Sequence, residues 1–205
     1  MTRVVLIRPG STDYDEQDRI QGTLDIPLNA HGAEEATQTA EGLREAAISR
    51  IFSCPGASSN ETARVIGKTL GIRVRKLDKL QNLNQGLWQG LQVDEVRRKH
   101  PKVYRQWCES PTTVCPPSGE TVVDAYERVA RVMKPLLKRH RDEVIGLVIP
   151  EPLASVIRCY LRGIDLKLVW ESGGADCRWE VVELADEQAK SSGPAPSPPP
   201  GTQST

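Results

Sequence analysis

The sequence predicts an α/β fold: a three-layer α/β/α sandwich built on a mostly parallel sheet. Apolar runs of strand length recur along the 205 residues, and segments with helical spacing of apolar residues separate them. The continuous apolar run 144–149 fits a central buried strand. The run 4–7 ends at Arg-Pro-Gly, as a strand that delivers a loop to a cleft would. Residues 1–185 are therefore expected to form one domain.

In the N-terminal half, helices and strands alternate after this first strand. A polar loop over 11–30 leads to a helix for which Asn29 is the expected N-cap. The apolar face of that helix comprises Ala36, Ala40, Leu43 and Ala47. Strands are then expected at 48–54 and 72–77, with a helix over 58–70 between them.

The C-terminal half continues the alternation. Further helices are expected over 93–107 (two, broken at Pro101), 121–140 and 153–162, and a last strand over 179–184. Pro135 is expected to kink the long helix or to end its first segment, whereas Pro152 suits the first turn of the next helix. The Pro/Ser/Gly-rich stretch 186–205 is expected to be a disordered tail, because it cannot bury enough apolar area to fold.

Composition excludes several classes of function. The formal net charge is zero, so neither a nucleic-acid partner nor a membrane partner is expected. The five cysteines have irregular spacing without a CxxC pair, which predicts neither a disulfide framework nor a metal site and favours a cytoplasmic location. No apolar run is long enough for a membrane span, and no cofactor is expected.

Short motifs occur along the chain in a specific order. They are Arg8-x-Gly10 after a strand, Gln21-Gly22, Pro27-Leu28-Asn29, Glu61-Thr62-Ala63, Gly86-x-Trp88-x-Gly90 and Ser118-Gly119-Glu120-Thr121. This series resembles the histidine phosphatase superfamily, the phosphoglycerate-mutase-like proteins. The resemblance implies a phosphoglycerate-mutase-like fold. It also implies a site for phosphoryl chemistry with two histidines, two arginines and usually one acidic residue.

The resemblance implies where those five groups should lie, and this chain departs from the pattern at four of them. Arg8 matches the first arginine. Pro9 stands at the position of the nucleophilic histidine and Pro150 at that of the second histidine. Ser58 replaces the second arginine, and Asn82 replaces the acid. Proline offers neither a nucleophilic side chain nor a backbone N–H, so the family's covalent route has no first step here.

We therefore predict a vestigial pocket with no catalytic residue. It is expected to comprise Arg8, Pro9, Gly10, Asp15, Gln21, Gly22, Ser58, Asn82, Pro150 and Glu151. Glu151 brings a carboxylate to a position where the family has glycine. Two unit charges ~4 Å apart interact by about 4 kcal/mol at an effective dielectric constant of 20. We expect Arg8 to pair with Glu151 or Asp15, which would leave the pocket with almost no affinity for anions.

Replacement nucleophiles and bases are scarce in the sequence. None of the three histidines (His31, His100 and His140) follows a predicted strand. Cys54 follows the second strand, but no histidine is placed to activate it. Catalysis by these side chains is not expected.

On these grounds the main prediction is a catalytically inactive protein that acts in binding, regulation or assembly. Its partner would be an unknown protein, a paralogue or a second copy of the chain in a homodimer. One alternative is a phosphatase-like or mutase-like enzyme with altered chemistry in the same cleft. Another is a sensor of a small, non-phosphate ligand, because the pocket offers asparagine and glutamine amides.

Overall fold

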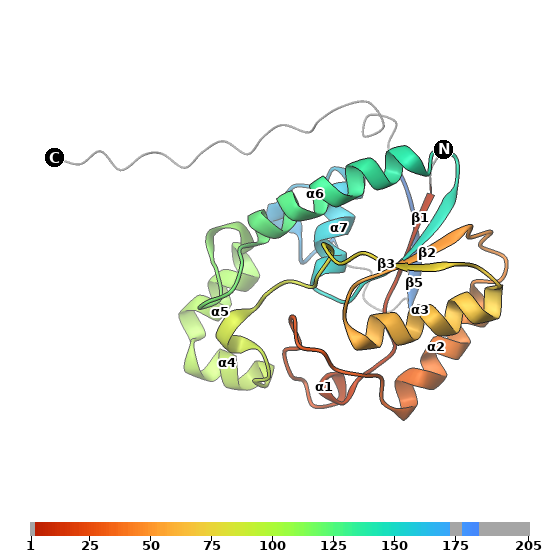
Figure 1. Ribbon diagram of the computed structural model, residues 1–205. Helices are drawn as coiled ribbons and strands as arrows, with labels where there is room; N and C mark the ends of the chain where they lie inside the picture. The colour runs from red at the N-terminus through yellow and green to blue at the C-terminus, as the bar shows by residue number, and fades with distance from the viewer. Residues whose placement is uncertain (1–2, 173–177, 185–205) are drawn as a thin grey trace.

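A five-stranded sheet forms the centre of the computed structural model, which describes residues 3–172 and 178–184 (Figure 1). The strands are β1 (Arg3–Ile7), β2 (Arg50–Ser53), β3 (Val74–Lys76), β4 (Val144–Val148) and β5 (Trp179–Glu183). Their order across the sheet is β3-β2-β4-β1-β5. All neighbouring strands are parallel except β5, which pairs antiparallel with β1. The predicted mostly parallel sheet, with β4 in the middle, is confirmed.

Helices cover both faces of the sheet, which completes the predicted three-layer sandwich (Figure 1). They are α1 (Asp13–Glu16), α2 (Ala30–Gly42), α3 (Ala57–Leu70), α4 (Val93–Lys99), α5 (Pro101–Glu109), α6 (Val122–Arg139) and α7 (Leu153–Arg162). Alternate side chains of β1 point to opposite layers. Val5 and Ile7 pack in a cluster with α2 and α3, whereas Val4 and Leu6 pack in the larger cluster with α6 and α7.

Most predicted elements occur, with local differences at their ends. The polar loop before α2 contains the unpredicted α1, whose N-cap Thr12 shares reciprocal hydrogen bonds with Asp15. Asn29 caps α2 as predicted, but α2 ends before Ala47. Pro135 does not end a helical segment, since α6 continues through it to Arg139. The tail predicted over 186–205 lies outside the described residues, and its disorder stays a prediction.

No helix within 3–172 or 178–184 combines the length and the apolar composition that crossing a bilayer requires.

The loop after β1 lies unusually close to the first turn of α2. A Cβ atom on Gly10 would clash with the backbone of Gly32, and a Cβ atom on Gly32 would clash with the backbone of Ser11. Two glycines therefore allow main chain to pack directly on main chain. This contact fixes the position of the residues that follow β1.

Replacing Gly32 with alanine should lower the free energy of unfolding by about 1–3 kcal/mol, because the added methyl has no room and backbone must shift. Gly42→Ala is the matched control in the same helix, since a Cβ there comes no closer than 3.4 Å to Trp179 Nε1. The control should be neutral or stabilising by up to ~1 kcal/mol, through helix propensity. Urea unfolding measures both values. Equal effects of the two substitutions would contradict the proposed close packing.

Candidate functional site

A cleft of about 310 Å³ lies where β1 and β4 end. Such a position, at the carboxyl ends of parallel strands, is where open α/β sheets bind ligands. Its lining includes eight of the ten residues predicted for the pocket: Arg8, Pro9, Gly10, Asp15, Gln21, Ser58, Pro150 and Glu151. The other two, Gly22 and Asn82, line an adjoining pocket of about 240 Å³ that shares Gln21, Ser58 and Pro150 with the cleft.

The loop after β1 is held by hydrogen bonds on both sides of Pro9, beginning with Arg8 N, which donates to Arg178 O at 2.9 Å. Gly10 N donates to Thr62 Oγ1 on α3 at 3.0 Å. Ser11 donates twice to the Glu35 carboxylate on α2, from its N at 2.8 Å and from its Oγ at 2.7 Å. Burial raises the pKa of Glu35, but the bonds from Ser11 lead the opposing causes and the net shift is downward. An ionised Glu35 therefore anchors the loop that carries Arg8.

Glu151 does not pair with Arg8, so the predicted neutralisation of the cleft is wrong. Glu151 Oε1 lies 3.3 Å from Arg158 Nη2, and its Oε2 accepts from Ser155 N at 3.0 Å and from Ser155 Oγ at 2.8 Å. The physical reason is that α7 begins two residues after Glu151, which brings its side chains at 155 and 158 back to that carboxylate. Within the described residues, no ion pair involves Arg8.

Asp15, the other predicted partner of Arg8, is engaged elsewhere. Its Oδ2 accepts from Thr12 N at 2.8 Å and from Thr12 Oγ1 at 2.7 Å. No hydrogen bond to Oδ1 is found within residues 3–172 and 178–184. The cleft thus has an oriented carboxylate, with an oxygen that no described residue holds, together with the Arg8 guanidinium, with which no described carboxylate pairs.

Asn82, 4% exposed, ties together segments that meet beside the cleft. Its Nδ2 donates to Gly22 O at 3.0 Å and to Glu151 O at 3.1 Å. Its Oδ1 accepts from Leu83 N at 2.8 Å and from Leu153 N at 3.3 Å. An ionised carboxylate could not make the two donations. The amide at this position therefore has a structural role that the motif comparison alone did not reveal.

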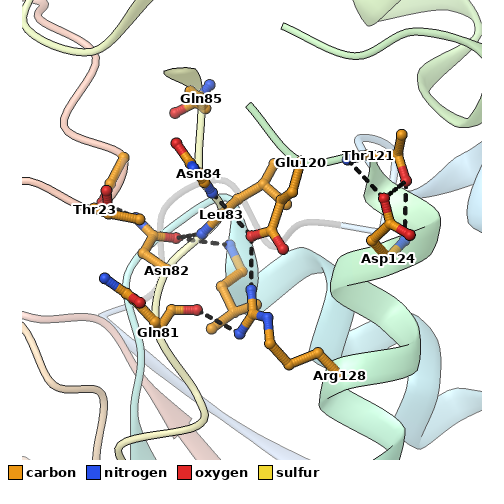
Figure 2. A network of polar contacts seen from close by, with 12 residues as sticks. Thr23, Gln81, Asn82, Leu83, Asn84, Gln85, Glu120, Thr121, Asp124 and Arg128 are labelled. Atoms are coloured by element: carbon orange, nitrogen blue, oxygen red, sulfur yellow. Dashed lines mark hydrogen bonds and ion pairs between the residues drawn. The ribbon is translucent and has the colours of Figure 1, made fainter. Parts of the chain in front are cut away.

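The segment around Asn82 is also fastened to α6 (Figure 2). The Glu120 carboxylate accepts from Asn84 N at 2.9 Å and from Arg128 Nη2 at 2.7 Å. Arg128 Nη1 donates to the carbonyls of Gln81 at 2.8 Å and Lys79 at 3.2 Å. The loop that borders the adjoining pocket is thus held at several backbone positions.

No histidine lines the cleft. His31 lies 3.4 Å from Glu35 on the exposed side of α2, and His140 is buried against Phe52 and Glu143 at the end of α6. His100 is exposed between α4 and α5. Cys54 lines the adjoining pocket, but burial raises the pKa of its thiol and so disfavours the reactive thiolate.

Several residues of the site were missed from the sequence. The cleft is also lined by Arg19, Ile20, Gln85, Trp107, Pro152 and Trp170. Arg158 lies behind Glu151 and is 3% exposed. Arg158 could have been found from the sequence, because it lies within the apolar stretch of α7 and a buried cation requires a charged partner nearby. No sequence signal brings Trp107 and Trp170 to the same cleft.

Comparisons with known proteins extend over most of the chain. Residues 4–193 match the model of the histidine phosphatase superfamily (branch 1). The chain is 28% identical over 188 residues to Phosphoserine phosphatase 1 of Hydrogenobacter thermophilus, covering 92% of this chain and 89% of that protein. It is 27% identical over 210 residues to the probable phosphoglycerate mutase GpmB of Escherichia fergusonii, covering 95% and 97%. A solved mycobacterial glucosyl-3-phosphoglycerate phosphatase with VO3 has a TM-score of 0.83 at 26% identity, covering 91% and 93%.

These relatives overturn the prediction of a catalytically inactive protein. The proteins that this chain matches over nearly its whole length are named as phosphatases or as a mutase. Their names point to an enzyme and favour the alternative that we derived from the sequence, an enzyme of this type with altered chemistry.

The family assignment agrees with the fold as well as with the motif order. The superfamily model spans all seven helices and, apart from Arg3 at the start of β1, all five strands of the described structure. The solved relative superposes on the same mostly parallel sandwich. The chain belongs to branch 1 of the histidine phosphatase superfamily.

Proposed function

We propose that the chain is an enzyme that acts on phosphate monoesters in this cleft by a chemistry that does not use a phosphohistidine. The observation that carries the proposal is the Arg8 guanidinium, which lines the cleft and has no ion-pair partner among the described residues. The names of the chain's relatives supply the reaction class, phosphatase or mutase. The divergence at Pro9 and Pro150 supplies the difference in chemistry, since neither side chain can accept a phosphoryl group.

Anion binding rests on the balance of charge at the cleft. Its charged lining residues are Arg8, Asp15, Arg19 and Glu151, as far as the described part of the chain extends. Arg158 compensates Glu151, so that carboxylate does not cancel the positive charge of Arg8. A planar guanidinium can hold two phosphate oxygens in a bidentate contact. Arg8 is therefore the proposed phosphate-binding residue.

Asp15 is the proposed general base for direct attack by water. In this reaction the water oxygen forms a bond to phosphorus while the ester P–O bond breaks. The proton of the water passes to Asp15, and the leaving alkoxide takes a proton from solvent. The hydrogen bonds from Thr12 orient the Asp15 carboxylate and leave Oδ1 for the water.

Cellular setting and assembly are separate proposals. A cytoplasmic location, a protein partner or homodimer, and the division into a domain over 1–185 and a tail over 186–205 stay predictions from the sequence.

Arg8→Ala should lower kcat/KM for phosphate monoesters by ~10²–10³-fold, because a charged donor to the phosphoryl oxygens is lost. The kcat/KM of Arg8→Lys should lie between those of Arg8→Ala and the parent protein, because lysine keeps the positive charge but lacks the two-pronged donor geometry of the guanidinium. Release of inorganic phosphate from a panel of phosphate monoesters provides the measurement.

Arg3→Ala is the control for this experiment, because Arg3 is an exposed arginine at the opposite end of the same strand. It should leave the rate unchanged. The proposed activity would be refuted if no ester of the panel released phosphate, or if Arg8→Ala hydrolysed them at the rate of the parent protein.

Asp15→Asn should lower kcat by ~10²–10⁴-fold, because the amide cannot take a proton from water. The amide oxygen can still accept from Thr12, so the variant should unfold at the same urea concentration as the parent. Asp13→Asn is the matched control: it lies in the same helix, is exposed and does not line the cleft. A full rate in Asp15→Asn would assign the proton transfer to another group.

A further inference from the structure

Two aromatic side chains belong to the lining of the cleft. They are Trp107 on α5 and Trp170, which follows the 3₁₀ turn Leu166–Leu168; Ile20 and Pro152 line the same cleft. The ring centroids of the two tryptophans are 5.1 Å apart, with an angle of 42° between the planes. Trp170 Nε1 donates to Trp107 O at 2.7 Å. The hydrogen bond orients the indole of Trp170, which is half-buried and therefore offers part of its surface to a ligand.

The aromatic pair is anchored in the protein core. Trp107 is 7% exposed and packs edge-on against Trp88, with centroids 6.0 Å apart and an interplanar angle of 87°. Trp88 itself is 1% exposed. A ring held in this way offers a rigid apolar surface, because it loses little freedom when a ligand binds.

Few charges remain for a second anionic group of a substrate. Arg19, the other cation that lines the cleft within the described residues, already donates from Nε to Gln17 Oε1 at 2.8 Å and from Nη1 to Gly90 O at 2.6 Å. Arg158 is occupied by Glu151 and Glu180. A substrate that carries a carboxylate as well as a phosphate would therefore leave one of its anions poorly matched.

We propose that the cleft prefers phosphate monoesters of uncharged aromatic alcohols, with the phosphate at Arg8 and the ring against Trp170. This inference rests on the proposed function and specifies its substrate class. The lining of the cleft combines polar and charged side chains with the two tryptophans, and about 310 Å³ is enough for a ring and a phosphate.

The test compares esters whose leaving groups are all alkoxides of similar acidity. Benzyl phosphate carries the ring, cyclohexylmethyl phosphate has the same size without aromaticity, and phosphoserine carries a carboxylate. We expect kcat/KM for benzyl phosphate to exceed that for phosphoserine by about tenfold or more, with cyclohexylmethyl phosphate between them. Trp170→Leu should raise KM for benzyl phosphate by about tenfold and raise KM for phosphoserine by a smaller factor, so that the preference for the aromatic ester shrinks. A higher kcat/KM for phosphoserine would overturn the aromatic preference while leaving the phosphatase activity in place.

A binding experiment separates this inference from the proposed function. Benzylphosphonate, which cannot be hydrolysed at its P–C bond, should quench tryptophan fluorescence in the parent protein and not in Trp170→Leu. Trp179→Leu is the control, because Trp179 packs in the other core cluster; its quenching should remain. Quenching without hydrolysis of any ester would support the aromatic site and refute the enzyme. Absent quenching, or equal quenching in Trp170→Leu, would refute the aromatic site.

Discussion

The site depends on the placement of one buried guanidinium. Arg158, 3% exposed, lies between Glu151 from the loop after β4 and Glu180 from β5. Burial lowers the pKa of Arg158, but the two carboxylates raise it and leave it above its usual value, so the side chain stays charged. A buried cation is tolerated only when it is paired. The pairing compensates Glu151 inside the protein and leaves the charge of Arg8 for the cleft.

Much of the fold was predictable, because apolar pattern and end signals agree along the chain. The apolar run of β4 and the Asn29 cap of α2 predicted their elements closely. The antiparallel direction of β5 was not predictable, because a short apolar strand looks the same in either direction. The four-residue helix α1 was not predicted, because hydrogen bonds to Thr12 define it and it has no apolar face that a sequence pattern could reveal.

The position of the site was predictable from the sequence, but the pairing of its charged side chains was not. Motif order located the two proline-containing loops that carry Arg8 and Glu151, and both loops line the cleft. The partner of Glu151 was not predictable from motifs, because it depends on where α7 starts and on which side chains then face backwards. Trp107 and Trp170 meet only through the tertiary fold, since each lies on a separate segment with its own local reason to be apolar.

The amide at position 82 shows why substitutions in such a site are better interpreted together than one at a time. Considered alone, Asn82 is a missing acid. In the structure it donates to the backbone carbonyl of Glu151, whose carboxylate in turn is held by Arg158. An aspartate in its place would bring a negative charge against two carbonyl oxygens, Gly22 O and Glu151 O, in a buried position. The side chains at 82 and 151 are therefore mutually compatible parts of one polar arrangement, and among the described residues that arrangement leaves the charges of Arg8 and Asp15 available to the cleft.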